Sequence, residues 1–413
     1  MKRTSLLFRQ ALRRPSALLV FCLFVPPFLA PLHSAAAESV DRPLPGLSFK
    51  GFGTLGMAHS DDGNAQFVRD LSQPQGLQSG WSGKTDSVFG LQANLKINEQ
   101  SEAIVQGISR YRYNGTYTPE LTWAFLRQDF SPDFTARVGR LGTEFYMMAD
   151  SRLVGYANLP VRPPPDYYGP LVISYFDGFD LSATQKTPLG LLRGKLFAGY
   201  AAEKTPFVDS LTWKLNGSPI IGGHLDYLIG PWQIRLGHAQ IRFKHDQPLN
   251  ELAGLDVTGL APELSVANKW ANYDSLGIVY DKGPLQIQGM ISQIRYETAS
   301  YEDSKAAYGI DAYRLEYLTP YLGYSRAKSK ASLLTTPLPP LLGTQLSQLT
   351  AQTHSDQQTF TLGARWDFRQ NLALKAQVDI IRGTPQSLFP FRNSVPGWDG
   401  RMKIVSLTLD FVF

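Results

Sequence analysis

The sequence predicts an all-β protein, a transmembrane antiparallel β-barrel of about sixteen strands with one long loop folded into its interior. Three features of the 413-residue chain indicate this class. Apolar and polar residues alternate along many segments of about ten residues, the length that crosses a bilayer at the tilt of a barrel strand. Short and long connections follow one another regularly. After the N-terminal segment, no apolar run approaches the roughly 18 residues that a membrane-spanning helix needs.

The C-terminal segment, Lys403–Phe413, shows the alternation most clearly. Every second residue from Val405 to Phe413 is apolar, and Ser406 and Thr408 lie between them. Successive side chains point to opposite faces of a strand, so one face would be apolar and the other polar. A half-buried strand of a soluble β-sandwich would alternate in the same way. The length of the segment and its end at an aromatic residue favour a barrel strand.

The N-terminal segment predicts export across a membrane. Its first fourteen residues contain five Lys or Arg and no acidic residue, and Ala17–Ala30 is apolar apart from Pro26 and Pro27. Ala35-Ala36-Ala37 offers a small-residue cleavage site. This order is typical of a secretory signal peptide, whereas a membrane anchor would need a longer and unbroken apolar run. The expected domains are therefore a signal peptide at residues 1–37 and a barrel at residues 38–413.

Removal of residues 1–37 changes the charge and the cysteine content of the expected mature chain. The whole sequence has 40 Lys and Arg against 35 Asp and Glu, and five of the basic residues are in the leader, which leaves 35 of each. The balanced charge does not indicate a nucleic-acid partner. The only cysteine, Cys22, is in the leader as well. Neither disulfides nor thiol chemistry are expected in the mature chain.

Sixteen segments of the mature chain fit the pattern of a barrel strand, an even number as expected for a single-chain bacterial barrel. In chain order they are Leu47–His59, Ser87–Ile97, Glu102–Tyr113, Glu120–Gln128, Phe134–Phe145, Leu171–Thr184, Arg193–Glu203, Gly222–Ile229, Trp232–Arg242, Tyr273–Asp281, Leu285–Tyr296, Tyr308–Arg314, Leu318–Arg326, Gln358–Asp367, Leu372–Arg382 and Lys403–Phe413.

The alternation also predicts which way side chains face. In the fourth segment Leu121, Trp123 and Phe125 would face outward, and in the third Arg110 and Arg112 would face inward. Inward residues should be mostly small or polar, with no packed apolar core, because a barrel of this size holds water. Outward aromatic residues near strand ends should lie at the level of the lipid headgroups. They are Tyr111, Tyr113, Trp123, Phe134, Trp232, Tyr280, Trp366, Phe411 and Phe413.

The connections predict the orientation of the barrel. Short turns such as Gly230-Pro231 and Lys282-Gly283-Pro284 alternate with long segments, and in bacterial barrels short turns face the periplasm while long loops face outside. The long segments are Ser60–Thr85, Met147–Pro170, Lys204–Ile221, His245–Asn272, Ala327–Gln357 and Gly383–Arg401. The loop at residues 147–170 also contains several prolines, which stiffen the backbone. Both chain ends would then lie in the periplasm.

Short motifs resemble the general porins of Gram-negative bacteria. Val138-Gly139-Arg140-Leu141, before Met147–Pro170, is similar to the Gly-Arg motif that precedes the third loop of those porins. Val161-Arg162-Pro163-Pro164 and Phe176–Leu181 resemble one branch of the family, and the terminal Phe413 resembles the family's assembly signal. The resemblance covers the whole mature chain. It implies a third loop that folds inward and narrows the lumen, and passive diffusion of small hydrophilic solutes.

The resemblance also implies a cellular setting and partners. The protein would lie in the bacterial outer membrane, contact its lipid and lipopolysaccharide, and be inserted by the barrel-assembly machinery. Porins of this family are usually homotrimers. The second loop, Asn114–Thr118, is very short, and this departs from family members whose second loop contacts the neighbouring subunit. No cofactor and no metal are expected.

The expected constriction combines the resemblance with the inward phase of the strands. Arg140 matches a basic residue of the family's pore constriction, and Arg110 and Arg112 are added because they would face inward. Glu144, Asp150 and Asp166 are the acidic candidates opposite them. Arg152 and Arg162, which lie in the expected constriction loop at residues 147–170, complete the set of candidates. Opposed charges would create a transverse field that orients dipolar solutes and sets the ion preference.

Three other functions remain open at this point. A substrate-selective channel for an anion or a sugar would share the fold. An outer-membrane hydrolase would need a His paired with Asp, Asn or Ser, and the five histidines after the leader are scattered, with only His224 and Asp226 on one strand face. A structural or adhesive barrel would be expected to have larger exterior loops.

Overall fold

The computed structural model describes residues 46–207, 211–330, 354–384, 387, 391–392, 394–395 and 397–413. The predicted signal peptide at residues 1–37 lies outside this range and stays a prediction. Parts of the two long connections Ala327–Gln357 and Gly383–Arg401 also lie outside it.

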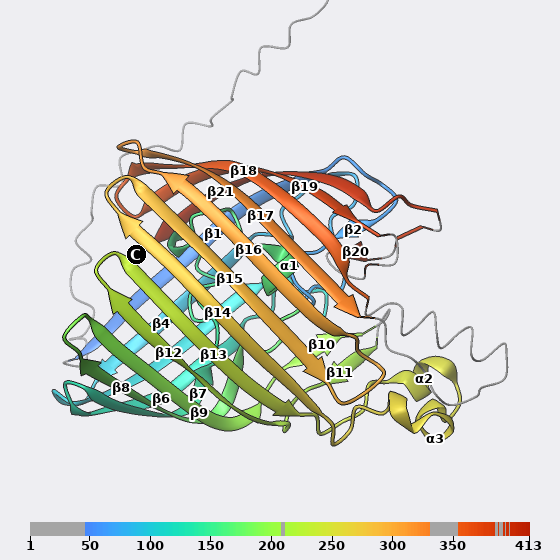
Figure 1. Cartoon of the computed structure of the whole chain (residues 1–413), viewed down its shortest axis with the longest axis horizontal. Coiled ribbons are helices and arrows are strands. Elements are labelled where there is room, and N and C mark those ends of the chain that lie inside the picture. Colours follow the sequence, from blue (N-terminus) through green and yellow to red (C-terminus); the bar gives the residue numbers. More distant parts are fainter. Residues whose placement is uncertain are drawn as a thin grey trace, which may run out of the picture. The chain divides into compact units, whose positions relative to one another are not determined.

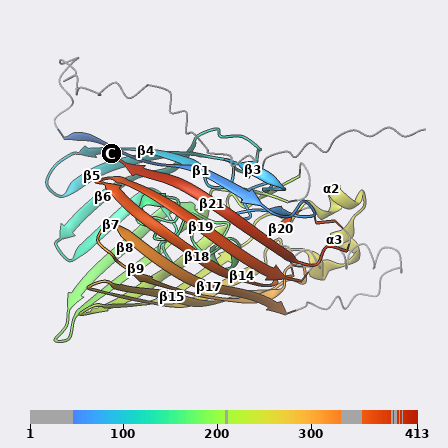
Figure 2. The ribbon, with the colours of Figure 1, turned by 90° about the horizontal axis from the view of Figure 1, so that it is seen from above.

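Among the described residues, sixteen strands form one closed antiparallel barrel (Figures 1 and 2). Each strand pairs with the next, and the ring closes where β1 pairs with β21, with Phe52 opposite Val412. Closure leaves no open edge, which a sheet in lipid requires. The strands are β1 (Leu47–Ser60), β4 (Val88–Lys96), β5 (Ser101–Arg110), β6 (Glu120–Ser131), β7 (Phe134–Gly142), β8 (Tyr175–Lys186), β9 (Leu191–Ala201), β12 (Pro219–Ile229), β13 (Trp232–Arg242), β14 (Trp270–Lys282), β15 (Leu285–Tyr296), β16 (Asp303–Tyr313), β17 (Leu318–Lys330), β18 (Asp356–Arg369), β19 (Leu372–Gly383) and β21 (Arg401–Val412).

The predicted all-β barrel is confirmed, and most strand boundaries agree with the sequence to within a few residues. The remaining elements are short pieces in the long connections. They are β2 (Gln66–Phe67), β3 (Gly80–Ser82), β10 (Lys204–Pro206), β11 (Thr212–Lys214), β20 (Phe391–Arg392), α1 (Pro165–Tyr168), α2 (Leu249–Ala253), α3 (Val257–Leu260), and two 3₁₀ turns, η1 (Gly155–Ala157) and η2 (Pro262–Leu264). In the described part of the chain, none of the helices has the length and apolar character needed to cross a membrane.

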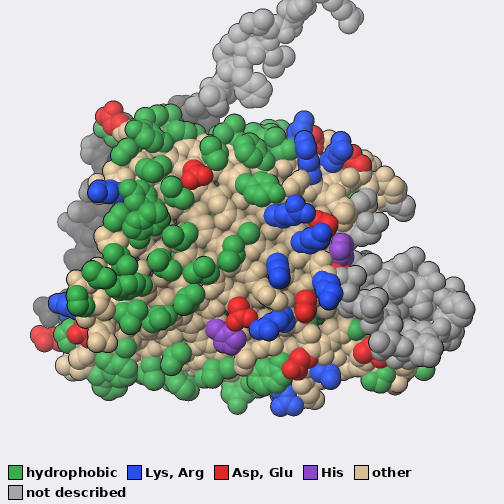
Figure 3. All heavy atoms as spheres, viewed as in Figure 1, with side chains coloured by type: hydrophobic (Ala, Val, Ile, Leu, Met, Phe, Trp, Pro, Cys, Tyr) green, Lys and Arg blue, Asp and Glu red, His purple; other side chains and the backbone are tan. Residues whose placement is uncertain are grey.

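The outer face of the barrel carries the apolar side chains that the alternation predicts. Leu55 and Leu196 are 64% and 69% exposed, and similar residues form a broad apolar belt (Figure 3). Such exposure is unfavourable in water but suits contact with lipid chains. The short turns and the C-terminus gather at one end of the barrel, and α2, α3 and the small hairpins gather at the other (Figure 1).

Two glycines on β1 receive the terminal aromatic rings at the barrel seam. Gly53 lies opposite Phe411, and a Cβ at Gly51 would be only 2.2 Å from the Phe413 ring. The backbone of Gly51 also exchanges hydrogen bonds of 2.8 and 2.9 Å with Phe413. Phe413 is therefore the last rung of the ladder that closes the barrel, packed flat against a position where only glycine leaves space.

The prediction that Trp123 and Phe125 face outward is wrong. β6 contains a bulge in which Gln106 pairs with Trp123 while the adjacent Gly107 pairs with Leu121, so the residue between them is unpaired. A bulge shifts the alternation by one residue. Leu121 therefore faces outward as predicted, but Phe125 is buried inside the barrel and Trp123 packs beside it.

The aromatic residues expected near the headgroups divide into two groups. Trp232 and Trp366 are exposed on the outer face, and Trp232 packs against Tyr280 with ring centres 4.6 Å apart. Tyr111 differs from the prediction, because β5 ends at Arg110 and the chain then turns inward. Tyr111 is buried there, beside the ring of Tyr117.

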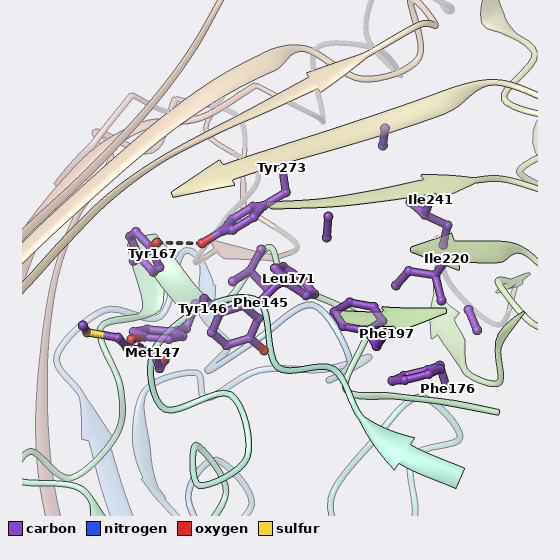
Figure 4. Close-up of a cluster of buried hydrophobic side chains, with 14 of the residues drawn as sticks. Phe145, Tyr146, Met147, Tyr167, Leu171, Phe176, Phe197, Ile220, Ile241 and Tyr273 are labelled. Atoms are coloured by element: carbon purple, nitrogen blue, oxygen red, sulfur yellow. Dashed lines mark hydrogen bonds between the residues drawn. The ribbon is translucent and has the colours of Figure 1, made fainter. Parts of the chain in front are cut away.

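The interior of the barrel differs from the polar lumen that the sequence analysis expects. A large apolar cluster fills part of it (Figure 4), with side chains from the strand walls packed against the loop that follows β7. Its labelled members are Phe145, Tyr146, Met147, Tyr167, Leu171, Phe176, Phe197, Ile220, Ile241 and Tyr273. Each such side chain stabilises the fold by about 1.5–3 kcal/mol on burial. The barrel therefore has a packed core around its inserted loop.

Candidate functional site

The connection between β7 and β8 runs through the barrel interior (Figure 1). We call residues 143–174 the inserted loop. It includes the segment Met147–Pro170, which the sequence predicts to fold inward, and it contacts wall strands around most of the ring. The following contacts show how it is held.

Arg162 is a deeply buried anchor of the inserted loop, with 1% of its surface exposed. Its guanidinium donates to both carboxylate oxygens of Asp86 at 2.8 and 2.7 Å and to Asp379 on β19 at 2.6 Å. It also lies over the ring of Phe67, 5.3 Å from the centre. Burial lowers the pKa of Arg162, but the two carboxylates outweigh this and raise it, so the group stays charged.

Lys375 on β19 holds the first turn of the inserted loop. Its Nζ donates to the carbonyl oxygens of Gly155 and Asn158 at 2.7 Å and lies 3.0 Å from the Asp410 carboxylate. Gly155 is needed for this approach, because a Cβ there would be 2.1 Å from Asp410 Oδ1. On β18, Arg365 donates to the Asn158 carbonyl as well, at 3.1 Å.

The short helix α1 fixes the middle of the inserted loop to the opposite wall. Proline at its first position suits a helix start, where the backbone N–H has no partner in the helix. The Asp166 carboxylate accepts hydrogen bonds from Ser325 on β17 at 2.7 Å and Gln357 on β18 at 3.1 Å. Burial raises the pKa of Asp166.

Two tyrosines of α1 extend this attachment to the neighbouring strands. The Tyr167 hydroxyl is 2.7 Å from that of Tyr273 on β14, the contact drawn in Figure 4. The Tyr168 hydroxyl is 2.8 Å from that of Tyr308 on β16. The helix thus contacts five consecutive wall strands, β14–β18, and its contact with β15 is through Met290 beside Tyr168.

Glu144 joins the start of the inserted loop to the inner wall. Its carboxylate pairs with Arg137 on β7 at 2.7 Å and with Lys195 on β9. Burial raises the pKa of Glu144, but Lys195 and Arg137 outweigh burial and lower it to about 2. Arg137 also pairs with Asp180 on β8. These contacts form a paired cluster rather than a free negative charge.

Glu203 lies where the inserted loop returns to the wall. It is 6% exposed, and its carboxylate accepts a hydrogen bond from the backbone N–H of Ser174. Burial is the main cause that raises the pKa of Glu203 to about 7, and the nearby Glu120 adds to it, while Arg152 and Arg110 oppose it. A carboxylic acid that titrates near neutral pH thus supports the loop.

Arg110, Arg112 and Arg152 also have structural partners. Arg110 lies 3.4 Å from both Asp70 and Glu120, and Arg112 pairs with Glu120 at 2.7 Å. Arg152 donates to the carbonyl of Leu171 at 2.8 Å, within the inserted loop itself. Asp150, by contrast, is exposed on the loop.

Arg140 does not project into the lumen. In the register of β7 and β8, Val138 lies opposite Phe179 and Arg140 opposite Asp177. Val138 and Phe179 are exposed on the outer face, and Arg140 shares that face, where it pairs with Asp177 at 2.7 Å. The expectation that Arg140 lines the constriction therefore disagrees with the strand phase, which turns Arg137 inward instead.

Most of the lumen charges that the structure brings together are paired at contact distance, whereas Asp166 accepts hydrogen bonds from neutral side chains and Asp150 is exposed. This differs from the expected arrangement of opposed charges across an open gap. Sequence reasoning missed several of the partners, which come from outside the inserted loop. Asp86 belongs to the turn before β4, and the partners on the strand walls are Arg137, Lys195, Arg365, Lys375, Asp379 and Asp410. The inward phase of the strand residues was visible in the sequence, but the contact that each makes was not.

Comparisons with known proteins agree on the fold. Neither a protein-family model nor a curated protein sequence matches this chain. Solved structures do match. OmpF of Salmonella typhi, in a complex with daunomycin, has a TM-score of 0.57 at 13% identity over 89% of this chain and 97% of its own. An anion-selective porin from Comamonas acidovorans has a TM-score of 0.54 at 14% identity over 89% and 99%. OprB of Pseudomonas putida has a TM-score of 0.55 at 11% identity over 89% and 94%.

This chain has the barrel fold of the porins. At such low identity the likeness concerns the fold alone, and residue roles must come from this structure. Both chains are covered almost end to end in each comparison.

One side-chain cluster bears on the hydrolase alternative. Ser329, Glu302 and His354 lie together near the loop end of β17, with His354 Nδ1 3.3 Å from the Ser329 hydroxyl and 2.7 Å from Glu302. A catalytic triad needs the two ring nitrogens of the histidine to bind the acid and the serine separately. Here the same nitrogen faces both, so this cluster does not have the geometry of a triad.

The outer face near the long loops carries a collar of basic side chains. Figure 3 shows Lys and Arg gathered between the apolar belt and the loop end of the barrel. We define the basic collar as the outward-facing Arg295, Lys305, Arg326, Lys328, Lys330, Arg382, Arg401 and Lys403. Some of these pair with acids, as Arg295 does with Asp274 at 2.9 Å. The basic residues nevertheless exceed the acidic ones on this band.

Proposed function

We propose that the protein is an outer-membrane porin, a channel through which small hydrophilic solutes and ions diffuse passively. The observation that carries this proposal is a closed sixteen-strand barrel with an apolar outer belt and a loop folded across its interior. The belt fits lipid, and the inserted loop narrows the passage while its residues Arg162 and Glu144 are paired with opposite charges. Neither feature is needed by a water-soluble protein.

The proposed setting follows from the same surfaces. The basic collar lies just beyond the apolar belt at the loop end, where the phosphates of lipopolysaccharide would be found, and cations favour such groups. Phe413 would be recognised by the barrel-assembly machinery before it closes the seam with β1. We further propose a homotrimer, which the family resemblance supports and the short segment Asn114–Thr118 does not favour.

The proposed constriction consists of the inserted loop and the charges that face it. Of the residues expected from the sequence, Glu144, Asp150, Arg152, Arg162 and Asp166 belong to it. Arg110 and Arg112 line its rim beside the first long loop. Arg137, Lys195, Arg365 and Lys375 join it from the wall. We propose that net ion preference depends on the small imbalance among these pairs.

Single-channel recording in a planar bilayer tests the proposal. The purified protein should give stepwise currents, and the reversal potential in a KCl gradient should reveal the ion preference. Closure in three equal levels would support the trimer, whereas single steps would indicate independent barrels. Absence of current at all voltages, from protein shown to be folded by its heat-dependent mobility on gels, would contradict the porin function.

A further inference from the structure

One sector of the inner wall is apolar although it faces the lumen. At the loop end of β12–β16, the inward positions are occupied by Ile220, Ala239, Ile241, Ala271, Ile294 and Ala306. Inward residues of a water-filled barrel are normally polar. Phe145 and Leu171 of the inserted loop belong to the same apolar cluster as this sector, and Figure 4 shows them together with Ile220 and Ile241.

The covering is incomplete and leaves a cavity. The cavity has a volume of about 200 Å³, and most of its lining is apolar. Phe145, Tyr167 and Leu171 of the inserted loop form one side, and Trp213 and Tyr296 are among the residues on the others. We call it the vestibule pocket, because it lies between the inserted loop and the long outer connections.

Aromatic rings form much of this lining. Trp213 of β11 packs on Phe243 with ring centres 4.9 Å apart and stacks on Tyr301 at 5.8 Å. Tyr301 in turn stacks on Tyr296, at 4.9 Å and with an angle of 23° between the rings. Aromatic rings favour contact with other rings through offset or edge-to-face packing.

The polar atoms of the Trp213 and Tyr301 rings already have protein partners. Trp213 Nε1 donates to the His245 carbonyl at 3.1 Å, and the Tyr301 hydroxyl accepts from Gln247 Nε2 at 2.7 Å. The rings are thus fixed in place by hydrogen bonds that point away from their faces. A ligand would meet apolar surface that does not need to rearrange, and such pre-organisation favours binding.

We propose that the vestibule pocket binds a small, uncharged aromatic solute. Most of the lining is apolar and aromatic, and its two carboxylates already have partners, Asp166 with Ser325 and Glu302 with His354. A charged solute would therefore lose its hydration there with little compensation. Apolar cavities of about 150 Å³ in proteins take up benzene-sized molecules. The inference rests on the proposed channel function, in which this pocket is a binding station beside the inserted loop that gives aromatic solutes a preference over sugars and ions.

Binding of 4-fluorophenol, followed by fluorine NMR on protein in lipid nanodiscs, tests the pocket without requiring conduction. The matched variants are Ala306→Phe and Ala307→Phe, neighbours on β16 that point inward and outward respectively. The native protein should bind the probe at a single saturable site. Ala306→Phe should weaken binding at least tenfold by filling the pocket, while Ala307→Phe should leave it unchanged. Ala271→Phe on β14 fills the same pocket from another strand and serves if Ala306→Phe does not fold.

The outcomes separate this inference from the channel function. Saturable binding that both inward variants abolish supports the pocket whether or not the protein conducts. Equal binding by all variants would mean partition into the lipid and would overturn the inference, as would absence of binding to the native protein. Conductance in KCl, recorded on the same preparations, reports on the porin function alone.

Discussion

Replacement of Arg162 should release the inserted loop at one of its most buried anchors. In Arg162→Met the apolar chain can stay over Phe67, but the guanidinium is lost and the Asp86 and Asp379 carboxylates lose their cation. Both carboxylates are almost fully buried. Removing one partner of a buried ion pair costs about 3–5 kcal/mol, because the other charge is left uncompensated. With two carboxylates affected, we expect the upper part of that range.

Loss of the Arg162 ion pairs should affect the conduction of the channel as well as the stability of the protein. Lys375 and the α1 contacts still hold the two flanks of the inserted loop, so the barrel should fold while the segment between them becomes mobile. We expect a lower urea midpoint, a higher single-channel conductance and more frequent current fluctuations. Equilibrium unfolding in detergent and planar-bilayer recordings measure these effects.

Two further variants sharpen the test. Arg401→Met removes a guanidinium whose side chain is 75% exposed. It should change the free energy of unfolding by no more than about 0.5 kcal/mol and should leave the conductance and the current fluctuations unchanged. Adding Asp86→Asn and Asp379→Asn to Arg162→Met should recover part of the lost stability, since no buried charge then remains unpaired. If Arg162→Met behaves as Arg401→Met does, the inserted loop is not held by this cluster and the reasoning is refuted.

Three other expectations follow from single contacts. Because the pKa of Glu203 is about 7 in the folded protein against 4.5 in the unfolded chain, its contribution is complete below pH 4.5 and is lost as pH rises through 7. The free energy of unfolding should fall by roughly 3 kcal/mol between pH 4.5 and pH values above 7. Glu203→Gln should flatten that part of the stability profile, measured by thermal unfolding at each pH. An unchanged profile in the variant would exclude Glu203 as the cause. Arg140→Ala should leave the reversal potential in a KCl gradient unchanged, whereas Arg137→Ala exposes acids and should shift it toward cations; a shift with Arg140→Ala alone would show that Arg140 reaches the lumen. Gly51→Val should displace the Phe413 ring and cost about 1–3 kcal/mol by overpacking, seen as a smaller heat-modifiable fraction on gels; normal assembly would show that the seam tolerates a side chain there.

The strands were predictable because their signal is local. A period of two needs only neighbouring residues, so β15 was placed at both its ends from the sequence. The same rule was sufficient for Arg140, which follows lipid-facing Val138 by two residues and must share its face. The motif resemblance pointed the other way. Strand phase is the stronger physical constraint, because a change of face would turn every side chain of β7 over.

The bulge in β6 could not be predicted from the sequence pattern of that strand alone. The extra residue between Leu121 and Trp123 has no marker such as glycine or proline, and its position depends on how β6 meets β5. Once it is present, Phe125 turns inward and joins the interior cluster. An alternation read from one strand alone cannot reveal such a shift.

The inserted loop explains why the sequence alone did not predict apolar residues at inward positions. An inward Ile or Tyr would be unfavourable in a lumen filled with water. Ile220, Ile241 and Tyr273 are therefore favourable at inward positions only because another surface covers their side chains. The prolines of residues 147–170 indicated a stiff loop, but not that its tyrosines and Arg162 would each find a partner on a different strand. The apolar wall and the loop are thus two halves of one interface, and the vestibule pocket is the part of that interface that the loop leaves uncovered.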